Sequence, residues 1–185
     1  MKTNKLKLLT SALALSMMAS ASLPVFAAGN GENVAVNIEA KATTVNITMS
    51  DTVPVTFNAD GTNTVPTNFS IKNNSAISGL HLDTVKLTAA ASTDWKVAAD
   101  SFNTKTMAKD TKTIIFKLGA EGKLKTAVPA SGTTAATGTA TFGAADFQIP
   151  ATGSKIMKFD ITRGAFSKEL TSAKAFDMVM NFSFD

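Results

Sequence analysis

The stretch FDMVMNFSFD, residues 176–185, decides the fold because large apolar side chains recur at every second residue, with mostly polar residues between them. One parity carries only large apolar side chains: Phe176, Met178, Met180, Phe182 and Phe184. Successive side chains of a β-strand point to opposite faces, so the pattern predicts a strand with one apolar face. A helix would scatter these residues around its circumference. So much apolar area has to be paired within a sheet or taken up by a neighbouring chain.

Short alternating segments of the same kind fill the rest of the chain. They are separated by turns rich in Gly, Pro, Asn, Asp and Ser, and no helical period is sustained. We therefore expect an all-β fold, an antiparallel β-sandwich that is Ig-like or jelly-roll-like, with roughly nine to eleven short strands. The expected common core contains Phe116, Phe159, Met178, Met180 and Phe182.

Three segments leave the local structure open. The apolar parity switches at Asp83-Thr84, which predicts either a β-bulge or a break between two strands. The Ala/Thr/Gly/Ser-rich stretch 121–140 is either a mobile loop or a poorly patterned hairpin. Residues 165–174 fit either a short helix anchored by Leu170 or a strand and turn.

The first 28 residues have the pattern of a secretory signal peptide. A basic start with Lys2, Lys5 and Lys7 precedes an apolar run, and small residues follow at 27–28. The run contains several serines and Pro24, and is shorter than the ~20 apolar residues of a spanning helix. We expect a signal peptide at 1–28, a single β-sandwich domain at 29–185 without a membrane span, and a secreted, extracellular or cell-wall-associated location.

Net charge and cysteine content narrow the class of protein. The formal net charge is +4, and removing the three leader lysines leaves +1, so the sequence does not favour nucleic acid as a partner. The chain has no cysteine, so packing alone has to stabilise the exported domain. Cysteine-free exported proteins are common in bacteria with a single membrane.

The sequence contains no catalytic or cofactor-binding signature, and we expect no enzyme activity, no cofactor and no metal. The single histidine, His81, alternates with two leucines and is expected to face water without a partner. Its replacement by alanine should then affect neither folding nor binding. The segment around Asp60-Gly61 faintly resembles a calcium loop, but Asp-Gly also favours a hairpin turn, which is the preferred interpretation.

The single tryptophan, Trp95, is the candidate ligand contact. An indole face can stack on a sugar ring, whereas a lone tryptophan in a sandwich more often belongs to the core. The chain has no tyrosine to extend a carbohydrate-binding surface. Both interpretations stay open at this stage.

Residues 50–97 carry a loose family resemblance. The segment contains Val53-Pro54-Val55, the Asp60-Gly61-Thr62 turn, Ile71-Lys72-Asn73-Asn74-Ser75 and Trp95-Lys96-Val97, in that order. It distantly resembles the WxL-type surface proteins of Gram-positive bacteria. That resemblance implies a secreted sandwich at the cell surface. The third position of the Trp-x-Leu motif is Val97 here, and there is no second tryptophan.

We expect a non-enzymatic structural or interaction protein of the cell surface or extracellular matrix. Its partners would be a cell-wall polymer, other surface proteins or itself. The alternative is a carbohydrate- or cell-wall-binding module. The segment with Val34, Val36 and Ile38 alternates like a strand after a Gly-Asn-Gly leader, and is the candidate strand for self-assembly by exchange between copies. Ordinary pairing within its own sandwich is the competing interpretation.

Overall fold

The computed structural model describes residues 17–19, 38–40, 45–168, 170 and 173–185. These residues form sixteen β-strands and one short 3-10 helix, η1 (Thr104–Thr106), so the protein is all-β. The chain divides into two units, Met1–Thr44 and Val45–Asp185. In the first unit, β1 (Met17–Ala19) pairs antiparallel with β2 (Ile38–Ala40).

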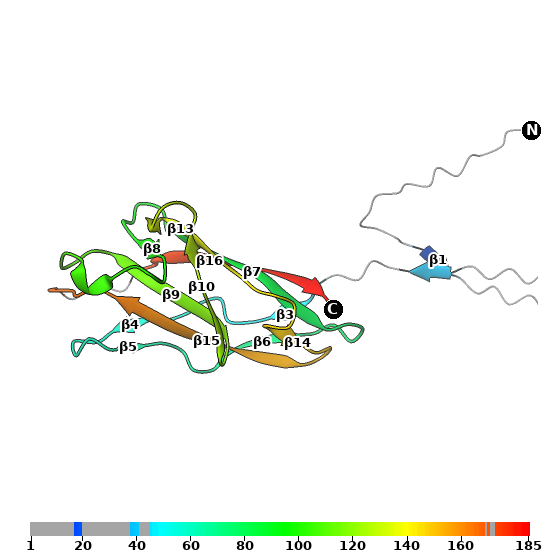
Figure 1. Cartoon of the computed structure of the whole chain (residues 1–185). Helices are drawn as coiled ribbons and strands as arrows, with labels where there is room; N and C mark the ends of the chain where they lie inside the picture. The colour runs from blue at the N-terminus through cyan, green and yellow to red at the C-terminus, as the bar shows by residue number, and fades with distance from the viewer. Residues whose placement is uncertain (1–16, 20–37, 41–44, 169, 171–172) are drawn as a thin grey trace, which may run out of the picture. The chain divides into compact units, whose positions relative to one another are not determined.

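The second unit is a β-sandwich whose larger sheet has seven strands (Figure 1). Their order is β12 (Thr134–Ala135), β8 (Lys96–Ala98), β9 (Thr113–Ala120), β15 (Ser154–Arg163), β6 (Phe69–Asn73) and β3 (Ile47–Thr48), with β10 (Lys123–Thr126) also beside β9. All pairs are antiparallel except β8–β9, which is parallel. The polar stretch between these two strands, including η1, is long enough for the crossover that parallel strands need.

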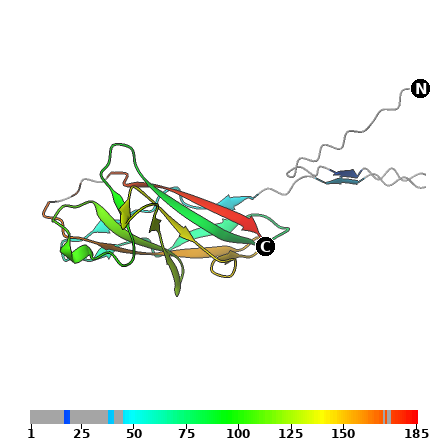
Figure 2. The ribbon, with the colours of Figure 1, turned by 45° about the horizontal axis from the view of Figure 1, so that its top comes forward.

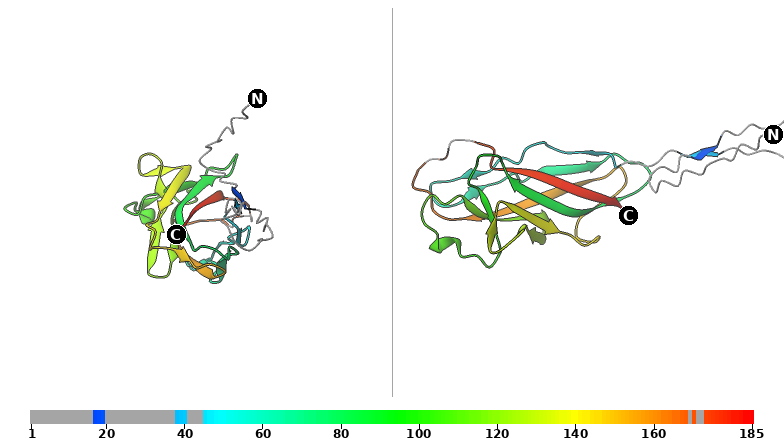
Figure 3. Two further views of the ribbon diagram at one scale, coloured as in Figure 1. Left: turned by 90° about the vertical axis from the view of Figure 1, so that its right-hand side faces the viewer. Right: turned by 90° about the horizontal axis from the view of Figure 1, so that it is seen from above.

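The smaller sheet has five strands and is built around β7 (Leu80–Ala89). One side of β7 pairs with β13 (Thr137–Thr141) and β14 (Gln148–Ile149), and β13 pairs in turn with β11 (Val128–Pro129). The other side pairs along its whole length with β16 (Phe176–Phe184), drawn in red in Figures 2 and 3. Asn181 faces Thr84 and Phe182 faces Leu82, so Asp83 is the extra residue of a β-bulge. Of the two alternatives that the parity switch predicts at this position, the bulge is therefore confirmed and the break between two strands is wrong.

The core lies between the two sheets. Phe116 and Phe159 are 6% and 7% exposed, and their ring centroids lie 6.0 Å apart. Met178, Met180 and Phe182 pack against this cluster but are only half-buried. The predicted apolar face of the 176–184 strand is therefore confirmed, whereas its full burial is wrong, because β16 has one neighbouring strand among the described residues.

The strand count exceeds the expected nine to eleven. Fourteen strands lie in Val45–Asp185, and six of these have only two residues. Residues 121–140 form strands β10–β13, which join both sheets, rather than a mobile loop. No α-helix occurs among the described residues, and Leu170 is 38% exposed, so it anchors none.

Residues 46–74 form one hairpin whose middle is unpaired. The β3–β6 ladder lies at one end, and β4 (Thr56–Phe57) pairs with β5 (Asn63–Thr64) at the other. In every pair of both ladders the two residue numbers add up to 120, so the two short sheets share one register. We call this hairpin, with Ser50–Pro54 running unpaired beside Pro66–Ser70, the split hairpin.

Two prolines explain the split. The shared register places Pro54 directly opposite Pro66. The amide of Asn58 donates to Thr62 and that of Asn74 donates to Asn46, so the even-numbered pairs exchange the hydrogen bonds. Pro54 and Pro66 belong to this series, and neither has an N–H to donate. The ladder therefore loses both of its hydrogen bonds at that pair.

Candidate functional site

Trp95, which directly precedes β8, lies in an aromatic cluster with residues of β4, β16 and the segment after β15. Its ring centroid is 6.1 Å from Phe57, 6.2 Å from Phe166 and 6.1 Å from Phe176. The guanidinium of Arg163 lies over the Phe57 ring at 4.9 Å. Trp95 is half-buried rather than enclosed. These ring contacts stabilise one end of the domain, which is a structural role for Trp95.

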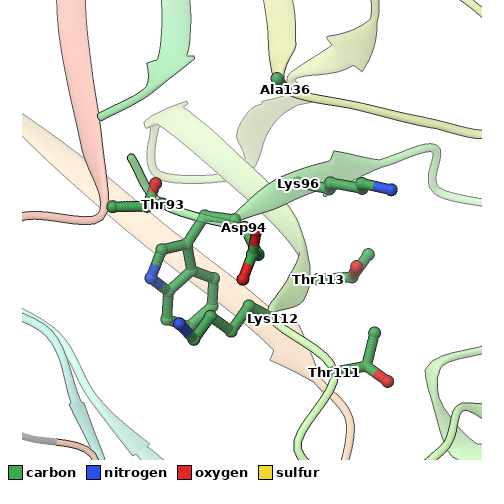
Figure 4. A pocket seen from close by; sticks show the side chains of 8 residues that line it. Thr93, Asp94, Lys96, Thr111, Lys112, Thr113 and Ala136 are labelled. Carbon is green, nitrogen blue, oxygen red and sulfur yellow. The ribbon is translucent and has the colours of Figure 1, made fainter. Parts of the chain in front are cut away.

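The remaining surface of Trp95 lines a hollow of about 490 Å³. Its other lining residues are mostly polar: Thr93, Asp94, Lys96, Thr111, Lys112, Thr113 and Ala136. Figure 4 shows the side chains of Asp94, Lys112 and Thr113 among those that line this opening. An indole face beside hydroxyl, carboxylate and amine groups is chemically suited to a polar ring such as a sugar.

The split hairpin has an opening of about 430 Å³. Its lining residues are Ser50, Thr52, Pro54, Pro66, Asn68, Phe69 and Ser70. Apart from Phe69, these are the three even-numbered facing pairs of the unclosed ladder. Backbone groups on both sides of the opening are thus aimed at one another without pairing. Of these, the carbonyl of Thr52 accepts from the Ser50 hydroxyl at 3.2 Å, and the amide of Thr52 donates to the same hydroxyl oxygen at 3.5 Å.

His81 lies between two carboxylates, which corrects the expectation that it has no partner. Its Nδ1 is 2.8 Å from Oδ1 of Asp185, and its Nε2 is 3.2 Å from Oδ1 of Asp83. The other oxygen of Asp83 accepts from the Ser183 hydroxyl at 2.6 Å. The imidazole is only 16% exposed. A neutral imidazole donates to one carboxylate and an imidazolium to both.

This network fastens β16 to β7, and it offers no free ring nitrogen to a substrate. The amide of Asp185 donates to the carbonyl of Gly79, and a Cβ at Gly79 would collide with the Asp185 carboxylate. The carboxylates lie on opposite sides of the ring, which is unsuitable for holding one ion. Among the described residues, no group of three His, Cys, Asp or Glu is arranged to hold a metal.

The Asp60-Gly61 segment forms a hairpin turn, the preferred of the two interpretations. Asp60 accepts from the amide of Thr62 at 2.9 Å and from its hydroxyl at 2.7 Å. These hydrogen bonds hold the pKa of the Asp60 carboxyl below its ordinary value. Gly61 has φ of 87°, which glycine adopts readily.

The candidate assembly strand falls mostly outside the described residues. Val34 and Val36 lie outside them, and Ile38 begins β2 opposite Ala19. The split hairpin was not recognised from the sequence. The signal that could have found it is the pair of prolines, equidistant from the Asp60-Gly61 turn.

Comparisons with known proteins found no family model that matches the chain, and no curated protein or solved structure that matches it significantly. The resemblance to WxL-type proteins therefore stays a prediction. Within the described part of the chain, no helix is both long and apolar enough to cross a membrane.

Proposed function

We propose that the protein is a non-enzymatic structural or interaction protein of the cell surface or extracellular matrix, and that it associates with itself by strand addition. The segment of Val34, Val36 and Ile38 supplies the added strand. The observation that carries the proposal is the split hairpin, which leaves facing backbone groups unpaired within a sheet. A signal-peptide pattern supports the extracellular location.

The split hairpin suits an incoming strand better than an ordinary sheet edge does. An edge can bond a new strand on one side only, whereas a strand inserted into the opening bonds on both sides. Val53, Val55 and Val65 line the inner side of this hairpin and pack against the core. The alternating Val34, Val36 and Ile38 can continue that apolar face. Repeated head-to-tail insertion forms a filament.

The first experiment removes the donor strand. Deleting residues 29–40 from the mature chain should abolish large assemblies in sizing chromatography and electron microscopy. A matched pair of variants separates side chains from length: Val34, Val36 and Ile38 to Ser in one, and Ala35, Asn37 and Glu39 to Ser in the other. The first should not assemble and the second should. A full chain that stays monomeric, or a deletion that assembles equally well, contradicts the proposal.

The second experiment closes the acceptor. Replacing Pro54 and Pro66 by Thr restores two N–H donors at facing positions. Residues 50–54 should then pair with residues 66–70 and leave no opening for a strand of a second copy. Assembly should then fall although the folded domain becomes more stable. Slower amide exchange of residues 50–54 verifies that the two strands of the hairpin have paired. If the variant then assembles as well as the wild type, the incoming strand does not bind in the split hairpin.

A second candidate function is binding of a cell-wall glycan at the hollow beside Trp95. The observation that favours it is that Asp94, Lys112 and Thr113 line the same hollow as Trp95. Replacing Asp94 and Lys112 by Ala should abolish pull-down on purified wall polysaccharide. Trp95→Ala is avoided because it also disrupts the aromatic cluster. Wild-type protein that does not bind removes this candidate.

A further inference from the structure

The side of β16 that faces away from β7, its free edge, leaves five residues unpaired. The amide of Ala90 donates to the carbonyl of Ala175, and the amide of Asp185 donates to Gly79. Backbone groups alternate sides along a strand, so the odd-numbered residues of β16 bond to β7. The even-numbered residues direct N–H and C=O to the free edge: Phe176, Met178, Met180, Phe182 and Phe184. Within the described residues, β16 pairs with β7 alone.

This edge lacks three of the devices that often prevent edge pairing, which are a short strand, lysine and proline. β16 is nine residues long and contains neither lysine nor proline, the two residues that most often blunt an edge. The other edge strands of the two main sheets are short: β3, β11, β12 and β14 have two residues each, and β10 has four, two of them lysine. Pro129 lies in β11 and Pro150 follows β14. The contrast singles out β16 as a surface available for pairing.

We propose that two copies of the chain form a symmetric dimer by antiparallel pairing of β16 with β16. With Met180 opposite Met180 of the second copy, Phe176 faces Phe184 and Met178 faces Phe182. Every even-numbered residue then has an even-numbered partner, and each such pair exchanges two hydrogen bonds. Shifting the register by two residues or more leaves donors unpaired at both ends. The edge thus determines its own register.

Side chains agree with this register on both faces. Opposite residues of an antiparallel pair lie on the same face, so the half-buried Phe and Met residues of both copies form one apolar layer. On the outer face, Val179, which is 55% exposed, meets Asn181, and Asp177 meets Ser183. No like charges face each other.

The dimer is distinct from the proposed strand exchange. It is an isologous contact between identical strands, whereas exchange is a heterologous contact that repeats. It needs neither residues 29–40 nor the split hairpin. The rival occupant of the free edge is the 34–38 segment of a second copy, and the test separates the two.

The register test uses the absence of native cysteine. In the proposed dimer the odd-numbered pairs are the closer, non-hydrogen-bonded ones, where Cα atoms lie about 4.5 Å apart and a disulfide fits. A mixture of Val179→Cys and Asn181→Cys proteins should give a covalent dimer under mild oxidation, and either protein alone much less. Asp177→Cys mixed with Val179→Cys is the matched control and should not cross-link.

The affinity test removes one donor at the free edge. Met180→Pro deletes an N–H that points away from β7, and should weaken the dimer about tenfold or more in sedimentation velocity. Met180→Ala is the control, because it loses the side chain but keeps the N–H, and it should still dimerise. Circular dichroism verifies that both fold. If Met180→Pro does not fold, the cysteine result decides.

Three outcomes overturn the dimer. The first is a folded chain, lacking residues 29–40, that is monomeric at millimolar concentration. The second is cross-linking as efficient for Val179→Cys alone as for the mixture. The third is an association that disappears on deletion of 29–40 without any 179–181 cross-link, which assigns the free edge to the 34–38 segment.

Discussion

β15 and β16 have nearly the same sequence character but different surroundings. Both alternate Phe, Met or Ile with polar residues, over ten and nine residues. In β15, Met157, Phe159 and Ile161 are 0%, 7% and 5% exposed, whereas the corresponding residues of β16 are half-buried. Residues 154–157 of β15 pair with β6 and residues 158–163 pair with β9, so β15 is an inner strand of its sheet, whereas among the described residues β16 pairs with β7 alone. Alternation sets the face on which a side chain lies, and the position of the strand within its sheet sets its burial.

The largest expected effect tests the central strand. Phe159→Ala should destabilise the domain by about 3–5 kcal/mol, because the ring is buried between Phe69 at 5.4 Å and Phe116 at 6.0 Å. Urea unfolding measures the change. Val179→Ala on the outer face of β16 is the control and should shift stability by no more than about 0.5 kcal/mol.

A half-buried ring on the edge strand should matter less. Phe182→Ala is expected to cost about 2 kcal/mol, since only part of its apolar surface is removed from water. The measurement is made at protein concentrations low enough to keep the chain monomeric. A loss equal to that of Phe159→Ala would show that the two strands are equally buried and end the comparison.

Side-chain contacts fasten β16 where a second neighbouring strand is missing. His81→Ala should cost about 1 kcal/mol, because it leaves the Asp83 and Asp185 carboxylates without the imidazole that joins them. Hydrogen exchange should accelerate at the amide of Asp185, which bonds to Gly79, and not in β15. If hydrogen exchange at the amide of Asp185 is unchanged in this variant, His81 does not fasten β16 to β7.

The smallest expected effect on stability comes from the ion pair between Lys125 and Asp146, which lies beside β13 and β14 rather than β16. Lys125 lies 2.9 Å from Asp146, and this contact, with the amide of Gly143, holds the pKa of the Asp146 carboxyl below its ordinary value of 3.8. A lowered pKa stabilises the fold above the unfolded value and is lost as the pH falls through the folded one. Stability should therefore decline below about pH 4.

The acid-unfolding curve of Asp146→Asn tests this decline. The variant should be less stable than the wild type at pH 6, and the difference should shrink towards pH 2. The carboxyls of Asp60 and Asp110 also have lowered pKa values, from hydrogen bonds to Thr62 and Ser167, so part of the acid sensitivity remains in the variant. A difference that grows on acidification contradicts the assigned sign.

Local pattern predicted the all-β sandwich and gave the bulge at Asp83 as one of two alternatives, because alternation and its interruption are properties of neighbouring residues. It did not predict that β16 is an edge, since strand order depends on pairing between distant segments. His81 was misjudged for the same reason: Asp185, its closest partner, is 104 residues away in sequence. The split hairpin was not predicted because it requires Pro54 to face Pro66, and this can be inferred only after the register of the hairpin is known from its turn.

The position of β7 in the chain also determines when the smaller sheet can form, because β7 is synthesised before all of its partner strands. Residues 80–89 pair with residues 137–141, 148–149 and 176–184. At a synthesis rate of about 5–20 residues per second, β7 leaves the ribosome about 5–20 s before β16 does. Pairing itself takes milliseconds to seconds for such non-local β-topologies. Synthesis is therefore slower than folding here, and the smaller sheet can be completed only after residue 184 has emerged.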